Sequence, residues 1–239
     1  MLFFYVRHGD PIYDPDSLTP LGSRQAEALA KRLALFGLDK IYSSPSNRAI
    51  LTARPTCELL KLEPELLDFC NEGYALKDFF VGDATYSDWA FRHLKVRPML
   101  MDPAVVAMGH DWYRHPSLDA YTFGQGVERV YDGLDELMSS LGYAHDRYHG
   151  RYRVEQPDDK RVALFAHQGF GLVFLSCLLD IPYPLFATHF DICPSGMTVI
   201  DLREEDGWAV PRVLTWSSDS HIYREGLPLR YDSDKRWQF

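Results

Sequence analysis

The stretch Met1-Leu2-Phe3-Phe4-Tyr5-Val6-Arg7-His8-Gly9 places a short apolar run directly before charged and polar residues. Residues 2–6 have the continuous apolar character of a strand that is buried on both faces, as in the centre of a parallel sheet. Ligands bind at the carboxyl ends of the strands in such sheets. Residues 7–9 are therefore predicted to lie at the ligand-binding edge of an α/β fold.

The next segment alternates between predicted helix and strand. Residues 20–36 carry apolar side chains at helical spacing, with Thr19 as a candidate N-cap and Gly37 as a stop signal. The rhythm continues with a strand at 40–43, a helix at 46–60 that contains Pro55, and a third strand at 66–70. This order is typical of an α/β protein.

The middle of the chain departs from that rhythm. Residues 73–157 are rich in aromatic side chains and histidines, and their first clear helical pattern falls at 123–141. The rhythm returns with a strand at 162–165, a helix at 169–179 and strands at 197–202 and 210–216. We therefore predict one domain over residues 1–239, with a core at about 1–72 and 158–217 and a lid-like insertion at about 73–157.

Composition excludes several classes of partner. The net charge of −9 argues against binding to a nucleic-acid backbone. No apolar run reaches the roughly 18 residues that cross a bilayer, and residues 1–6 lack the basic start of a signal peptide. We expect no membrane partner and a cytoplasmic location. The four cysteines have no metal-ligand spacing and are predicted to be buried thiols.

Two arginines and two histidines follow predicted strands and should meet at one edge of the sheet. Arg7 and His8 follow the first strand, Arg48 follows the second, and His167 follows the strand at 162–165. Guanidinium groups match phosphate oxygens, a helix N-terminus adds an anion site, and a neutral imidazole can attack phosphorus. Glu72, just after the third predicted strand, supplies a candidate acid for the leaving group.

Several short motifs occur in a fixed order along residues 2 to about 202. They are Arg7-His8-Gly9, Leu18-Thr19-Pro20-Leu21-Gly22 with Gln25-Ala26, Ser43-Ser44-Pro45 with Arg48-Ala49 and Thr52-Ala53, Asn71-Glu72, and Ala166-His167-Gln168-Gly169. This ordered set resembles the histidine phosphatase superfamily, the phosphoglycerate-mutase-like fold, in its larger branch. The resemblance implies a three-layer α/β sandwich with a six-stranded, mostly parallel central sheet and helices on both faces.

The resemblance also implies roles for the matched residues. His8 would be the phosphorylated nucleophile, with His167 as a second catalytic histidine and Glu72 as general acid and then base. The phosphate would be bound by Arg7, Arg48, His167 and Gln168. No cofactor and no metal ion is implied. Because the sequence after Glu72 departs from the family pattern, Asp78 and Asp83 are reserve candidates for the acid.

These roles predict a phosphomonoester hydrolase that acts through a phosphohistidine on a small phosphorylated substrate. A phosphoglycerate-type mutase is an alternative, but mutases carry a longer segment than residues 10–17 between the first two motifs. A non-catalytic phosphate-binding scaffold would be expected to lose the nucleophile or an arginine. His145 and His149 have the spacing of metal ligands on a helix, but we interpret them as a solvated polar segment because no third ligand is evident.

Overall fold

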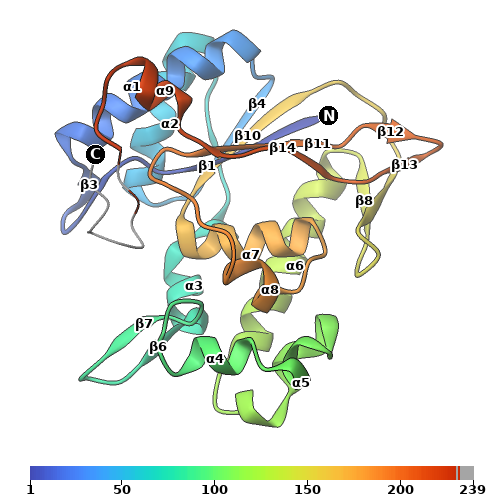
Figure 1. Cartoon of the computed structure of the whole chain (residues 1–239). Coiled ribbons are helices and arrows are strands. Elements are labelled where there is room, and N and C mark those ends of the chain that lie inside the picture. Colours follow the sequence, from blue (N-terminus) through green and yellow to red (C-terminus); the bar gives the residue numbers. More distant parts are fainter. Residues whose placement is uncertain (230, 232–239) are drawn as a thin grey trace.

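A six-stranded sheet forms the centre of the structure, a computed structural model that describes residues 1–229 and 231 (Figure 1). In spatial order its strands are β14 (Arg212–Ser218), β11 (Met197–Asp201), β1 (Leu2–Arg7), β10 (Arg161–Ala166), β4 (Lys40–Ser43) and β5 (Glu65–Leu66). The neighbours from β1 to β5 pair in parallel, and β11 is antiparallel to both of its neighbours. The predicted mostly parallel sheet is confirmed.

Helices cover both faces of this sheet (Figure 1). One face carries α1 (Pro20–Phe36), α2 (Asn47–Leu60) and α9 (Ser220–Arg224). The other carries α3 (Glu72–Phe79), α6 (Phe123–Ser140), α7 (Gln168–Leu178) and α8 (Tyr183–Ala187). The three-layer arrangement is therefore also confirmed.

The side chains of β1 alternate between the two layers because successive strand residues point to opposite faces. Phe4 and Val6 are fully buried in a cluster with Leu29 and Leu33 of α1. Phe3 and Tyr5 are fully buried in the larger cluster on the opposite face, which includes the apolar residues of α6 and α7. A strand buried on both faces needs a continuous apolar sequence, and residues 2–6 supply it.

The predicted helix at 20–36 is confirmed at both ends. The Thr19 hydroxyl accepts a hydrogen bond from the Gly22 amide at 3.0 Å, and Gly37 ends the helix with a positive φ of 70°. The predicted strand at 66–70 is wrong beyond Leu66. Asp68–Cys70 forms a 3₁₀ turn, η1, and the Asn71 side chain then caps α3 through the Gly73 amide at 3.0 Å. This capping interaction turns the chain away from the sheet and into a helix.

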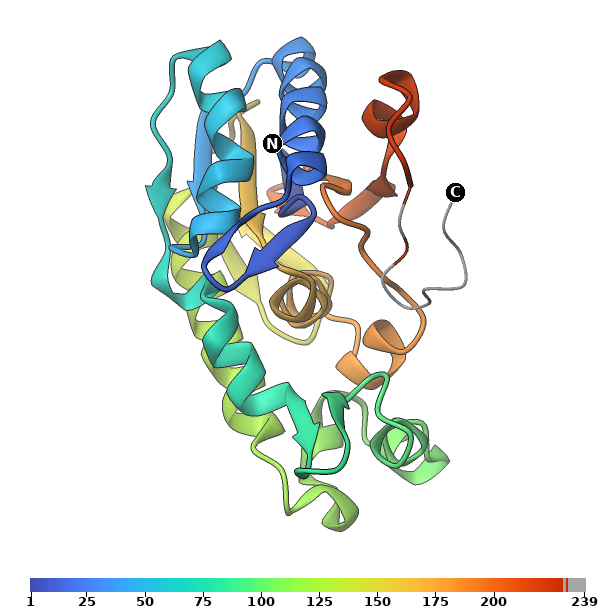
Figure 2. The ribbon, with the colours of Figure 1, turned by 90° about the vertical axis from the view of Figure 1, so that its left-hand side faces the viewer.

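Residues 80–122, between α3 and α6, extend beyond the helical layer on the side of α7 (Figure 2). Trp112 stacks on Tyr183 of α8 at 5.5 Å between ring centroids, so the segment shares one hydrophobic cluster with the helices of that layer. The division into a core and a lid-like insertion stays a prediction. The remaining elements of residues 73–157 are β6 (Phe80–Gly82), β7 (Ser87–Trp89), α4 (Val96–Leu100), α5 (Pro103–Val106), η2 (Gly109–Arg114), η3 (Pro116–Leu118), β8 (Tyr143–Asp146) and β9 (Arg151–Val154).

Two small hairpins complete the described structure. β2 (Pro11–Tyr13) pairs with β3 (Asp16–Leu18), and β12 (Glu204–Glu205) and β13 (Trp208–Ala209) extend the sheet of β8 and β9. None of the helices within residues 1–229 is long and apolar enough to cross a membrane. The four cysteines are free thiols, and all but the partly buried Cys193 are buried.

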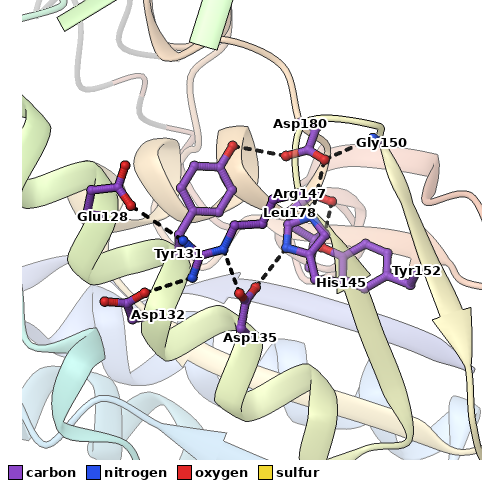
Figure 3. Close-up of polar contacts among 10 residues, drawn as sticks. All are labelled: Glu128, Tyr131, Asp132, Asp135, His145, Arg147, Gly150, Tyr152, Leu178 and Asp180. Atoms are coloured by element: carbon purple, nitrogen blue, oxygen red, sulfur yellow. Dashed lines mark hydrogen bonds and ion pairs between the residues drawn. The ribbon is translucent and has the colours of Figure 1, made fainter. Parts of the chain in front are cut away.

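A buried polar cluster joins α6, β8 and the end of α7 (Figure 3). The side chain of His145, on β8, is only 1% exposed, so its interpretation as part of a solvated polar segment is wrong. Its Nδ1 bonds Asp135 at 2.8 Å and its Nε2 bonds Asp180 at 3.2 Å. The ring also stacks on Tyr152 at 4.3 Å between centroids. Burial opposes protonation of His145, but the two carboxylates outweigh it and raise its pKa.

This cluster makes stability depend on pH. A raised pKa means that the stabilisation from charged His145 is complete below the unfolded pKa of about 6.5 and is lost as pH rises through the higher folded pKa. We expect His145→Gln to lower the unfolding free energy by about 3 kcal/mol at pH 6, because the buried Asp180 loses His145, its charged partner. Urea unfolding from pH 6 to pH 9 measures both effects. A variant as pH-dependent as the wild type would contradict this assignment.

Candidate active site

The strand register places three chain segments at one level of the sheet. Arg7 lies opposite Ala166, and Phe165 lies opposite Ser43. Beyond these pairs the His8 amide donates to the Ala166 carbonyl at 2.9 Å, and the Ser44 amide donates to the Phe165 carbonyl at 2.8 Å. The residues that follow β1, β4 and β10 therefore meet at one edge, as predicted from their positions after strands.

His8 is buried at this edge with a defined tautomer. Its Nδ1 lies 2.7 Å from the Gly9 carbonyl oxygen. A carbonyl can only accept, so Nδ1 carries the proton and Nε2 keeps its lone pair. Burial, reinforced by the positive charge of Arg7, holds the pKa of His8 well below its usual value. The ring is therefore a neutral imidazole with Nε2 as its nucleophilic atom.

His167 faces His8, with their ring centroids 5.3 Å apart. Its Nε2 forms a 2.7 Å hydrogen bond with the Ser44 hydroxyl. Its Nδ1 is buried and has no hydrogen-bond partner in the part of the chain that the structure describes. The pKa of His167 is well below its usual value, mainly because the ring is buried and to a smaller extent because His8 and Arg48 lie nearby. When the Ser44 hydroxyl donates to Nε2, Nδ1 carries the proton and can donate to an anion.

Arg7 and Arg48 bring two buried guanidinium groups to the same site. Arg7 donates from Nη1 to the Ile192 carbonyl at 2.6 Å, and Arg48 donates from Nη1 to Asp16 at 2.8 Å. The Nε atom of Arg48 is buried and has no partner among residues 1–229 and 231. Both arginines lower the pKa of His8 and of His167, which shows that their charges act on both rings.

Glu72 is the first residue of α3 and meets the N-terminus of α7. Its two carboxylate oxygens accept hydrogen bonds from the Gly169 and Phe170 amides, at 3.1 Å each. Burial raises the pKa of Glu72 to about 7, although these amide bonds and the charge of Arg48 act in the opposite direction. Near neutral pH this carboxyl group can therefore both give and accept a proton.

The other candidate polar residues occupy different surroundings. The amide nitrogen of the Gln168 side chain contacts the Asp191 carboxylate, while its backbone starts α7. Asp78 is paired with Arg129 on α6, away from the two histidines. Asp83 closes an exposed turn, where hydrogen bonds from Thr85 help to hold its pKa at about 2. The charges of Arg48 and Arg7 lower the pKa of Glu72, which places this carboxyl group within electrostatic range of the two arginines.

One wall of the site was not identified from the sequence. Residues 191–196 lie beside the end of β1, where the Gly196 carbonyl accepts from the Arg7 amide at 3.2 Å. The Ser195 amide donates to the His8 carbonyl at 2.9 Å. These contacts use backbone atoms, so no side-chain pattern identifies them. Asp16 and the Ser44 side chain also contact site residues, and no distinctive spacing marked those contacts.

Within residues 1–229 and 231 there is no group of three or more His, Cys, Asp and Glu side chains that could hold a metal ion. His149 is exposed, with 67% of its side chain accessible, and bonds Asp146 of the same hairpin. His145 has both ring nitrogens engaged by carboxylates. The two histidines therefore do not form a pair of metal ligands.

The sequence profile of the histidine phosphatase superfamily (branch 1) matches residues 4–75, which contain Arg7, His8, Arg48 and Glu72. Residues 4–75 are therefore similar in sequence to this superfamily. Branch 1 agrees with the predicted larger branch. A search of curated protein sequences found no match.

Solved structures of similar fold cover nearly the whole chain. Phosphoserine phosphatase from Entamoeba histolytica has a TM-score of 0.61 at 18% identity, over 92% of this chain and 98% of that one. A mycobacterial glucosyl-3-phosphoglycerate phosphatase has a TM-score of 0.59 at 18% identity, over 91% and 98%. Alpha-ribazole phosphatase from Shigella flexneri has a TM-score of 0.57 at 20% identity, over 92% and 97%. At these identities the likeness is one of fold.

The environment of Glu72 predicts an unusual titration. We expect its carboxyl group to titrate near pH 7, above the ordinary value of about 4.3, because burial disfavours the carboxylate. Carbon-13 NMR of protein labelled at the glutamate carboxyl groups measures the midpoint, and Glu72→Gln identifies the signal by its loss. A midpoint at or below 5 would contradict the burial described above.

Proposed function

We propose that this protein is a phosphomonoester hydrolase that transfers the phosphoryl group of a small substrate to His8 and then to water. The observation that supports this best is a pair of buried polar atoms without partners, Arg48 Nε and His167 Nδ1. Buried polar groups are normally hydrogen-bonded, so atoms left open in a described site suggest a missing ligand. Both residues lie close to His8: the charge of Arg48 lowers the pKa of His8, and the ring of His167 contacts the His8 ring.

In the first half-reaction, His8 Nε2 attacks phosphorus and the bond from phosphorus to the substrate oxygen breaks. Glu72, protonated in half of the molecules at a pH near its pKa of about 7, gives its proton to the departing alkoxide. In the second half-reaction, Glu72 removes a proton from water as the water oxygen attacks phosphorus. The bond from phosphorus to His8 breaks, and phosphate and the starting protonation states are produced.

The positive charge for this transfer comes from side chains of the site. Arg7 and Arg48 offer guanidinium donors that match phosphoryl oxygens, and the backbone at the start of α7 adds an N-terminal dipole. His167 contributes a further donor at Nδ1, and Gln168 is proposed to contribute from the same helix start. These groups supply the charge stabilisation that a metal ion supplies in other phosphoryl-transfer enzymes, so the proposed reaction needs no metal.

Small phosphorylated molecules are the proposed substrate class. The similar structures are named as phosphatases of phosphoserine, glucosyl-3-phosphoglycerate and alpha-ribazole phosphate, which are all of this kind. The short β2–β3 hairpin, in place of the longer segment of mutases, favours transfer to water. The complete set of arginines and histidines favours catalysis over a binding-only role. A cytoplasmic location and the absence of nucleic-acid and membrane partners stay predictions.

The nucleophile can be tested directly. We expect His8→Ala to abolish turnover of p-nitrophenyl phosphate and to prevent formation of an acid-labile phosphoenzyme, because the variant lacks the imidazole Nε2 at the end of β1. Rapid quench in alkaline denaturant with ³²P-labelled substrate, followed by peptide mapping at alkaline pH, measures the phosphoenzyme. Circular dichroism controls for folding. Label on another residue of the wild type, or normal turnover by the variant, would refute the assignment.

The proton donor has a separate signature. We expect Glu72→Gln to slow hydrolysis of an alkyl phosphate by about 10²-fold or more, and hydrolysis of p-nitrophenyl phosphate much less, because a good leaving group needs little protonation. In the wild type, kcat/KM for the alkyl ester should fall above about pH 7 as Glu72 loses its proton. The variant should lack this alkaline decrease. Equal losses on both esters would assign the acid role to another group.

A further inference from the structure

The β2–β3 hairpin contacts the candidate site through one carboxylate. Asp16, on β3, accepts a hydrogen bond from Arg48 Nη1 at its Oδ1, at 2.8 Å. Its Oδ2 accepts from the Asn47 amide at 2.7 Å, and the Asn47 side chain donates to the Asp16 carbonyl, also at 2.7 Å. Three hydrogen bonds therefore fix Asp16 against the first turn of α2, where the N-cap residue Ser46 makes no side-chain capping bond.

This contact controls how the Arg48 guanidinium is turned. The group is planar, so holding Nη1 on Asp16 also fixes the directions of Nε and Nη2. Nε is buried and has no partner in the described residues. The charge of Arg48 lowers the pKa of both His8 and His167, so the guanidinium lies within electrostatic range of both rings. Asp16 thus engages one nitrogen and leaves the Nε–Nη2 edge for an anion.

Tyr13, on β2, contacts a different part of the same group. The ring centroid of Tyr13 lies 5.5 Å from Arg48 Cζ, within the range of a cation–π contact. The hairpin therefore contacts both an end and a face of one guanidinium. Such an arrangement restricts a long side chain that would otherwise sample several rotamers.

We propose that Asp16 is a positioning residue that holds Arg48 in the orientation needed to bind the transferring phosphoryl group, an inference that rests on the proposed function. Stability is not its main contribution. The side chains of Asp16 and Arg48 are 32% and 11% exposed, and ion pairs of this kind near a surface stabilise the fold only weakly. The effect of Asp16 is instead carried through Arg48 to the anion.

A double-mutant cycle with anion binding as its readout tests this role. Asp16→Asn keeps an oxygen for the Asn47 amide but removes the charge that faces Arg48. We expect Asp16→Asn to weaken orthovanadate binding about tenfold, as for directly coupled residues. Orthophosphate binding should weaken by less than about threefold, because orthovanadate resembles the transition state and depends more on donors held in fixed positions. In the Arg48→Ala background, Asp16→Asn should change neither affinity. Isothermal titration calorimetry measures the affinity of each of the four proteins for each of the two anions.

The matched control is Asp14→Asn, which removes the same charge from an exposed residue of the same hairpin and should leave both affinities unchanged. Asp16→Ser, which also offers an oxygen to Asn47, repeats the cycle if Asp16→Asn does not fold. Equal effects of the Asp16 substitution with and without Arg48 would overturn the positioning role, as would an equal effect of Asp14→Asn. Normal vanadate binding without any turnover by the wild type would overturn the proposed hydrolase alone, and no vanadate binding would overturn both.

Discussion

Backbone hydrogen bonds between the ends of three parallel strands hold the two histidines of the site in place. β1 and β10 run in register from Leu2 opposite Arg161 to Arg7 opposite Ala166. The next bond, from the His8 amide to the Ala166 carbonyl, places His8 beside the residue that precedes His167. A slip of one residue would turn every side chain of β1 to the opposite face. The register of β1 against β10 therefore fixes both the packing of the core and the position of His8.

The charged groups of the candidate site favour the binding of an anion. Two buried arginines lie close to two imidazoles, and burial acts with the arginines to keep both rings neutral. The same burial keeps Glu72 partly protonated near neutral pH, although Arg48 opposes this effect. Two guanidinium groups in a desolvated setting would favour the binding of an anion such as a phosphate dianion. A bound dianion would also raise the pKa of Glu72 further and favour its role as an acid.

Features set by local sequence could be predicted well. The helix at 20–36 carries its own N-cap residue, apolar face and C-terminal glycine in its sequence. The position of the residues after β1, β4 and β10 follows from the rule that ligands bind at the carboxyl ends of parallel strands. Glu72 was predicted at a strand end, but it starts a helix, because the Asn71 side chain caps α3 at this point. Tertiary contacts were harder to predict. His145 has the sequence surroundings of an exposed histidine, and only the packing of α6 and α7 against β8 provides its two carboxylates.

The residues that hold His8 in place do not change their protonation in the pH range in which Glu72 titrates. Ser195 donates its amide to the His8 carbonyl, and its hydroxyl bonds His221 Nε2 of α9 at 2.9 Å. Burial, reinforced by the charge of Arg32, lowers the pKa of His221 to about 4, so this ring is neutral from pH 5 upward. Burial, reinforced by the charge of Arg7, also holds the pKa of His8 well below its usual value. In the proposed reaction, a change in activity near pH 7 would therefore report the proton of Glu72 or of the substrate phosphate, while the geometry that holds His8 stays constant.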